Sequence, residues 1–214
     1  MPAPEALHLL ILGGTAEAAE LARRADERFG GHIRITNSLA GRTERPTALI
    51  GALRIGGFGG TEGLAAYVAE NAVDAVIDAT HPFAATISSH AHEAAAAIGT
   101  PLLRLDRPPW PRHPLDRWIE VDDLPGAARA LTRLGRRVWL TLGRSDLGAF
   151  AGLDRHWFLV RMIDRPPTSL PLAQYELLLS RGPFSLPEER LLIHRHGIEV
   201  LVVKASGGDA TAAK

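Results

Sequence analysis

Short apolar runs alternate with stretches of helical periodicity along almost the whole chain, and this alternation constrains the fold more than any other feature. We predict strands at Leu7–Leu12, His32–Asn37, Leu53–Ile55, Asp74–Ala79, Pro101–Leu105, Arg137–Leu142, Trp157–Arg161, Glu176–Ser180 and Glu199–Val203. Helices fill most of the intervals between them. Because strands that alternate with helices pair in parallel, the pattern predicts an α/β fold.

Several helix boundaries carry their own signals. The helix Ala16–Arg28 has Ala18, Leu21, Ala22 and Ala25 on one face. Thr61 is expected to cap the helix Glu62–Glu70, and Pro82 to lie in the first turn of a helix that ends at Gly99. In the second half, Asp122 or Asp123 is expected to begin a helix that runs to Leu134. Ser185 and Glu188 form a capping box for a helix that ends at Gly197.

A proline-rich segment divides the chain. Residues 105–115 contain four prolines, at 108, 109, 111 and 114, so neither a helix nor a central strand is possible there. We therefore expect a hinge at 105–115 between a domain at 1–104 and a second α/β domain at 116–214. The predicted architecture is two Rossmann-like lobes with parallel sheets and an active site in the cleft between them.

Composition excludes several classes of function. The 24 basic and 24 acidic residues balance, which argues against a nucleic-acid or anionic-membrane partner. The chain has no cysteine, and its histidines show no His-x-x-x-His spacing, so we expect no metal site. The N-terminus has no basic region before its short apolar run, so we predict that this run is a first strand and that the protein is cytoplasmic. We expect the protein to be a monomer.

The loop after the first predicted strand has the character of a phosphate-binding turn. Gly13, Gly14 and Thr15 open a helix, whose N-terminal N–H groups favour an anion such as a pyrophosphate. The spacing is not G-x-G-x-x-G, so a tight turn without a ligand is the alternative.

The loop after the second strand bears on the choice of cofactor. An NAD site usually places an acid there for the ribose 2′-hydroxyl. This chain instead has Ser38, followed by Gly41 and Arg42, which favours the 2′-phosphate of NADPH. The alternative is that Arg42 is only solvated.

Thr80 and His81 follow the fourth strand, where a nicotinamide ring is expected. His81 is the candidate catalytic residue as a general acid, with helix capping as its alternative role.

Three strand ends of the second lobe carry cations. They are Arg144 with Ser145, Arg181, and Lys204 with Ser206. Carboxyl ends of parallel strands share one edge of a sheet, so these groups are expected to form one shared site for an anionic ligand. The alternative for each cation alone is an ordinary surface charge.

Five stretches, in order along the chain, resemble the precorrin-6A reductase family of cobalamin biosynthesis. They are Ile11–Ala18, Asp78–Ala84, Leu140–Arg144, Arg181–Phe184 and Lys204–Gly208. The resemblance implies an NADPH-dependent oxidoreductase that acts on a CH–CH group and reduces one double bond of precorrin-6A to give precorrin-6B. The many carboxylates of such a tetrapyrrole give the arginine-rich second lobe a purpose. Family members continue past the final glycines, so a C-terminal helix and strand are expected to be missing here.

Two other functions remain open from the sequence. One is a different cytosolic NAD(P)H reductase, similar to dihydrodipicolinate reductase, which also carries an Asp-x-Thr-x-Pro-like loop. The other is a nucleotide-sensing module without catalysis. Mixing the protein with NADPH and a precorrin separates an enzyme from a sensor.

Overall fold

A computed structural model describes residues 6–41, 49–182 and 184–208. The chain divides into two compact units, Met1–Arg107 and Pro108–Lys214. Each unit has its own parallel sheet, so the predicted α/β class with two parallel sheets is confirmed. In the parts of the chain that the structure describes, no helix is long and apolar enough to span a bilayer.

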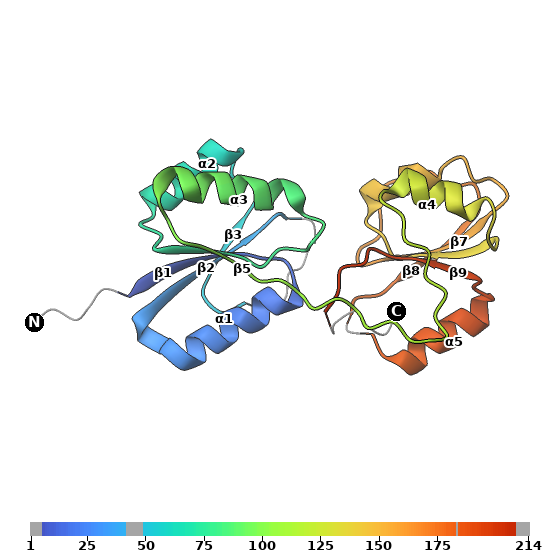
Figure 1. The fold of residues 1–214 in the computed structure, drawn as a ribbon, viewed down its shortest axis with the longest axis horizontal. Coiled ribbons are helices and arrows are strands. Elements are labelled where there is room, and N and C mark those ends of the chain that lie inside the picture. Colours follow the sequence, from blue (N-terminus) through green and yellow to red (C-terminus); the bar gives the residue numbers. More distant parts are fainter. Residues whose placement is uncertain (1–5, 42–48, 183, 209–214) are drawn as a thin grey trace, which may run out of the picture. The chain divides into compact units, whose positions relative to one another are not determined.

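The first unit is a five-stranded sheet in the order β3-β2-β1-β4-β5, with helices on both faces (Figure 1). Its elements are β1 (Leu7–Leu12), α1 (Ala16–Phe29), the 3₁₀ turn η1 (Gly30–His32), β2 (Ile33–Leu39), β3 (Ala52–Ile55), α2 (Thr61–Glu70), β4 (Ala75–Asp78), α3 (Ala85–Ile98) and β5 (Leu102–Arg104). From β1 the strands are added outward to β2 and β3 on one side, and then to β4 and β5 on the other side. The carboxyl ends of β1 and β4 therefore form a topological switch point.

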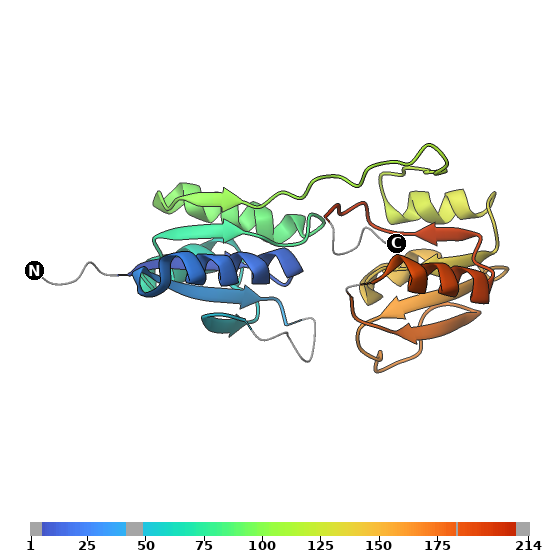
Figure 2. The same ribbon diagram turned by 90° about the horizontal axis from the view of Figure 1, so that it is seen from below.

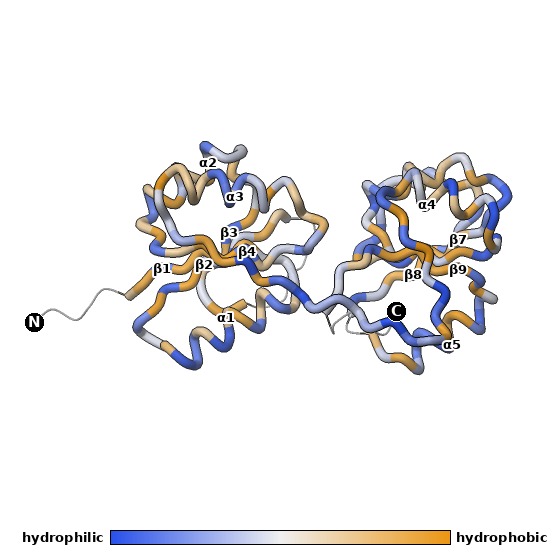
Figure 3. Tube along the Cα trace, viewed as in Figure 1, coloured by the Kyte–Doolittle hydropathy of each residue, from blue (hydrophilic) through white to orange (hydrophobic). Residues whose placement is uncertain are grey.

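Alternation along β1 gives this sheet two cores. Leu10 and Leu12 pack with α2 and α3, whereas Ile11 packs with Ala18 and Ala22 of α1 on the opposite face. The hydropathy view shows the apolar strands at the centre of each unit (Figure 3). The small side chains of α1 allow the helix to lie close to the sheet and bring its N-terminus to the end of β1.

The second unit is a four-stranded sheet in the order β8-β7-β6-β9, seen from another side in Figure 2. Its elements are α4 (Leu124–Leu131), β6 (Arg137–Leu140), the 3₁₀ helix η2 (Arg144–Phe150), β7 (Trp157–Met162), β8 (Tyr175–Leu179), α5 (Leu186–His196) and β9 (Val200–Val202). The Asp123 side chain caps α4, and the Ser185–Glu188 capping box begins α5 as predicted.

Two predicted helix starts and one helix end are wrong. Thr61 does not cap α2, because Gly60 occupies the capping position and the Thr61 hydroxyl donates to the carboxylate of Glu93. Pro82 lies in a turn before α3, which begins only at Ala85, because the N–H of Ala84 bonds the carbonyl of His81 and closes that turn. Helix α4 ends at Leu131 and not at Leu134.

Candidate active site

Three loops at the carboxyl edge of the first sheet are joined by hydrogen bonds. The N–H of Gly13 donates to the carbonyl of Ser38 over 3.0 Å, which ties the loop after β1 to the end of β2. The Thr15 hydroxyl donates to the carbonyl of Ala79 over 2.8 Å, which ties the same loop to the end of β4. The structure therefore brings together the predicted residues Gly13, Thr15 and Ser38 with the segment that leads to Thr80 and His81.

The loop after β1 has the backbone that a phosphate site needs. Gly14 has φ +99°, a conformation that side-chain-bearing residues rarely adopt, and a Cβ on Gly13 would lie 3.2 Å from the Cβ of Ala18. The Thr15 hydroxyl accepts from the N–H of Ala18 over 3.1 Å and so begins α1. The remaining N–H groups of the first turn lie where an anion is stabilised.

An ion pair lies beside this helix start. Glu17 in the first turn of α1 pairs with Arg107 over 2.9 Å, and the Arg107 side chain is only 8% exposed. The carboxylate of Glu17 would repel a phosphate, so its neutralisation by Arg107 makes the helix N-terminus a better anion site. Sequence reasoning missed this contact because Arg107 stands in the proline-rich segment, far from Glu17 along the chain.

The loop after β2 is described only in part. Ser38 is buried at the end of β2, and Gly41 has φ +72° and lies against Ile55, where a Cβ would be 3.1 Å from the Cγ2 atom. Arg42, which we predicted at the 2′-phosphate, lies outside the described residues.

The loop after β4 holds Thr80 and His81 in place. Thr80 donates from its hydroxyl (2.6 Å) and its N–H (3.1 Å) to the Oδ1 of Asp78. The N–H of Phe83 donates to the Nδ1 of His81 over 3.2 Å. In the neutral imidazole the proton is then on Nε2, so that His81 can both stabilise its turn and donate a proton.

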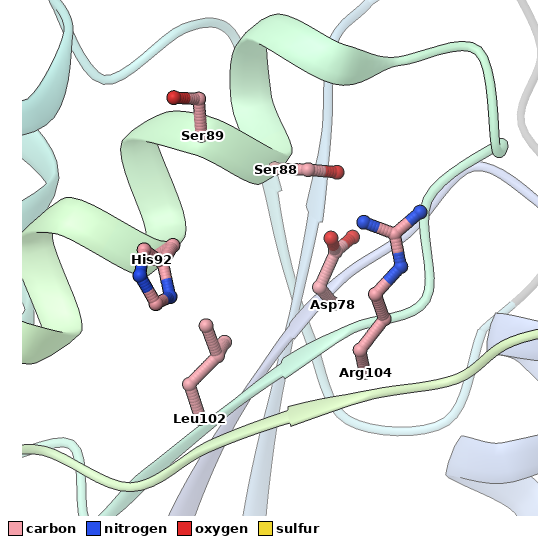
Figure 4. Close-up of a pocket in the computed structure, with 6 residues that line it drawn as sticks. All are labelled: Asp78, Ser88, Ser89, His92, Leu102 and Arg104. Carbon is pink, nitrogen blue, oxygen red and sulfur yellow. The ribbon is translucent and has the colours of Figure 1, made fainter.

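A cavity of about 480 Å³ lies beside this loop, between α3 and β5 (Figure 4). It is lined by Asp78, Ser88, Ser89, His92, Leu102 and Arg104. Asp78 is 4% exposed, and the close-up shows its carboxylate and the Arg104 guanidinium pointing toward one another. Sequence reasoning did not select Asp78 as a site residue, although an acid at the end of a buried strand was the available signal.

At the carboxyl edge of the second sheet, one of the three predicted cations pairs with a carboxylate. Lys204 follows β9 and pairs with Asp146 of η2 over 2.8 Å. Asp146 also accepts a long hydrogen bond of 3.4 Å from Ser145. Arg144 donates to the hydroxyl of Thr168 over 2.9 Å.

The other two predicted residues are Ser206, on the same loop as Lys204, and Arg181, which follows β8. Ser206 is buried, and its N–H donates to the carbonyl of Lys204 over 2.7 Å. Arg181 is exposed at the end of β8, which β7 separates from β6 in the sheet. The sequence did not single out Asp146 as the partner of Lys204.

Neither set of loops, in the part that the structure describes, holds a metal-ligating cluster. Within residues 6–41, 49–182 and 184–208, no three His, Asp or Glu side chains are placed to hold an ion.

The first sheet, with its glycine loop and capped helix start at the switch point, defines an α/β protein of the Rossmann-like class. Residues 8–214 match the family described as Precorrin-6x reductase CbiJ/CobK, and the chain belongs to this family of reductases.

Relatives support this assignment over nearly the full chain. The precorrin-6A reductase of Rhodococcus erythropolis is 48% identical over 206 residues, which cover 96% of this chain and 82% of that protein. The cobalt-precorrin-6A reductase of Salmonella typhimurium is 29% identical over 94% of this chain and 78% of that protein. A solved structure of CobK precorrin-6A reductase superposes with a TM-score of 0.91 and 39% identity, covering 97% of this chain and 81% of that one.

Proposed function

We propose that this chain catalyses the NADPH-dependent reduction of one macrocyclic double bond of precorrin-6A, giving precorrin-6B in cobalamin biosynthesis. The observation that carries the proposal is the 48% identity with a precorrin-6A reductase over 96% of the chain. Cobalt-precorrin-6A reductases are more distant, at 29% identity or less. This difference favours a macrocycle without cobalt as the substrate.

The first unit fits a dinucleotide. Gly13, Gly14 and Thr15 would hold the pyrophosphate at the start of α1, where Gly14 needs its positive φ and Thr15 already caps the helix. Ser38, Gly41 and Arg42 would hold the adenosine half, and Thr80 and His81 the nicotinamide half. NADPH, when bound, supplies a hydride to one carbon of the double bond and leaves as NADP⁺, while a proton completes the neighbouring carbon.

The second unit fits a substrate rich in carboxylates. Arg144, Ser145, Arg181, Lys204 and Ser206 follow strand ends at one edge of its sheet, which gives donors and positive charge to that edge. Arginine pairs bidentately with carboxylates, and lysine contributes a point charge. In the absence of substrate, Asp146 compensates Lys204, so that a substrate carboxylate would have to compete with it.

Proton delivery would fall to His81 or to solvent. The N–H of Phe83 orients the imidazole through Nδ1 and leaves Nε2 as the donor atom. The main contribution of the protein is then to hold the two reactants in contact, because positioning alone can lower a barrier by several kcal/mol.

The test is anaerobic mixing of the purified protein with precorrin-6A and either NADPH or NADH. The proposal expects loss of the nicotinamide absorbance with NADPH and formation of a product two mass units heavier, as two hydrogens are added. Turnover with NADH at equal or greater efficiency would contradict the choice of cofactor. Binding of NADPH without turnover of either precorrin-6A or its cobalt form would contradict the enzymatic function.

A further inference from the structure

Arg54 lies on the edge strand β3, directly beside Ser38. The sheet register pairs Ser38 with Arg54, and the Nη1 atom of Arg54 lies 3.4 Å from the Oγ atom of Ser38. Register partners on adjacent strands point to the same face of a sheet, so the two side chains share one face. Ser38 occupies the strand end where dinucleotide sites contact the adenosine ribose.

Contacts within the first unit fix the Arg54 guanidinium in one orientation. Its Nη1 donates to the carbonyl of Gly56 over 2.6 Å, and its Nη2 donates to the carbonyl of Gly57 over 2.9 Å. The guanidinium carbon lies 3.7 Å from the centre of the Phe58 ring and 5.1 Å from that of Tyr67. A cation held in this way loses little conformational entropy when it binds a ligand.

The contacts of Arg54 leave one edge of the guanidinium for a ligand. Of its five N–H donors, those to Ser38, Gly56 and Gly57 use both hydrogens of Nη1 and one of Nη2. Among the described residues, no acceptor takes the Nε–H or the second Nη2–H. These two donors form the fork that binds two oxygens of a phosphate or carboxylate side by side.

The charge of Arg54 is also uncompensated within the described part of the chain. Its partners are carbonyl oxygens, a hydroxyl and two aromatic rings, and none of them is a carboxylate. An acid at position 38, as in a site that prefers NADH, would neutralise this arginine. The serine hydroxyl leaves the positive charge available to an anion.

We propose that Arg54 determines cofactor specificity by binding the 2′-phosphate of NADPH, with the Ser38 hydroxyl as its neighbour. The inference rests on the proposed function, in particular on NADPH being the reductant. It assigns the phosphate to an arginine that follows Ser38 by 16 residues along the chain but lies beside it in the sheet.

Two nucleotides that differ only in the 2′-phosphate test the role directly. Calorimetry with 2′,5′-ADP and 5′-AMP on the full chain would compare wild type with Arg54→Gln, Arg54→Lys and Ser38→Ala. We expect Arg54→Gln to weaken 2′,5′-ADP binding by about tenfold to a hundredfold, the range for a charge-assisted hydrogen bond. Binding of 5′-AMP should be almost unchanged. Arg54→Lys keeps the charge without the fork and should fall between wild type and Arg54→Gln.

Arg34 offers a matched control on the neighbouring strand. It lies toward the amino end of β2 and contacts His8 and the carbonyl of Asn71, so Arg34→Gln should leave the affinity for both nucleotides unchanged. Ser38→Ala removes no charge and preserves the Arg54 contacts with glycine carbonyls and rings. This variant should weaken the binding of 2′,5′-ADP and not that of 5′-AMP, and it keeps the proposal testable if Arg54→Gln does not fold.

The outcomes separate this inference from the proposed function. If the wild type binds 2′,5′-ADP no better than 5′-AMP, the preference for NADPH itself is wrong. If the wild type prefers 2′,5′-ADP and the Arg54 variants keep that preference, the inference is overturned while the proposed function stands. An equal loss of affinity for both nucleotides in Arg54→Gln would mean that Arg54 only stabilises the turn at Gly56 and Gly57. That result would also overturn the inference.

Discussion

Arg161 and Glu189 form a buried bidentate ion pair in the second unit. The two hydrogen bonds measure 2.9 Å and 2.6 Å, and the side chains are 4% and 3% exposed. The guanidinium of Arg161 also lies over the rings of Trp139 and Phe184, at 4.4 Å and 4.0 Å. One side chain on β7 thus connects β6, α5 and the loop before α5.

The first prediction is that breaking this pair destabilises the second unit strongly. Glu189→Gln leaves the Arg161 charge buried without its partner, so we expect a loss of about 3–5 kcal/mol in the free energy of unfolding. The double variant Arg161→Met, Glu189→Leu removes both charges and should regain most of that loss. Urea denaturation followed by tryptophan fluorescence measures both. The prediction would be contradicted if the double variant lost as much free energy of unfolding as Arg161→Met and Glu189→Leu lose together when each is made alone.

The second prediction concerns Thr15, which joins the start of α1 to the end of β4. Thr15→Val removes the acceptor for the Ala18 N–H and the donor to the Ala79 carbonyl. Losing an N-cap costs about 1 kcal/mol, with up to about 2 kcal/mol in some proteins. Because the helix start is the expected pyrophosphate site, the affinities for NADPH and for NADH should fall by a similar factor in binding titrations.

Thr15→Ser is the control for this second prediction, since it keeps the hydroxyl and should behave as wild type. A Thr15→Val variant that loses affinity for only one of the two cofactors would show that the residue does not act through the pyrophosphate.

The third prediction concerns Lys204 and its partner Asp146. Lys204→Gln should raise the KM for precorrin-6A by about tenfold, from a charged hydrogen bond worth about 1.5 kcal/mol, with kcat less affected. Asp146→Asn should lower the KM, because it removes the carboxylate that competes for Lys204. Arg133→Gln is a control on an exposed arginine just after α4. If steady-state kinetics give the same KM for wild type and Lys204→Gln, this residue does not bind the substrate.

The fourth prediction is a pH dependence that comes from Glu199. Its carboxylate accepts the N–H groups of Arg137 (3.0 Å) and Arg136 (2.6 Å), and these hold its pKa below the ordinary value of 4.5. Because the folded pKa is lowered, the stabilisation is present above the ordinary pKa and is lost as the pH falls through the folded pKa. The advantage of wild type over Glu199→Gln in melting temperature should therefore shrink below pH 4.5. A difference that stays constant on acidification would rule out this linkage.

Much of the fold was predictable because local patterns agree with the tertiary structure. The strand Leu7–Leu12 and the Ser185–Glu188 capping box were predicted as the structure has them, since apolar alternation and capping depend on neighbouring residues. The predictions for Thr61 and Pro82 were wrong because contacts beyond the residue's own helix decided their positions. A good capping residue does not cap when a carboxylate from another helix binds its hydroxyl.

The residues of the candidate sites were predictable only where they come directly after the end of a strand. Residues after β1, β2 and β4 could be grouped because parallel strands share an edge, and Gly13, Ser38 and Thr15 do lie in one hydrogen-bonded set. Arg54, Asp146 and Arg107 were missed because register, ion pairing and loop path bring them to these edges. None of those depends on short-range sequence pattern.

The last prediction concerns His81, whose Nδ1 atom accepts the N–H of Phe83 over 3.2 Å. We expect His81→Ala to lower kcat by about tenfold or less, below the ~10²–10⁴ that loss of an essential acid costs, because solvent can deliver the proton after the hydride has moved. His81→Asn keeps an acceptor for the turn but has no titrating proton, so comparing the two variants separates turn stabilisation from proton donation. Single-turnover rates with saturating NADPH and precorrin-6A give the measurement. A thousandfold loss in both variants, with unchanged affinities, would make His81 the essential acid, whereas a loss in His81→Ala that His81→Asn restores would assign it to the turn alone.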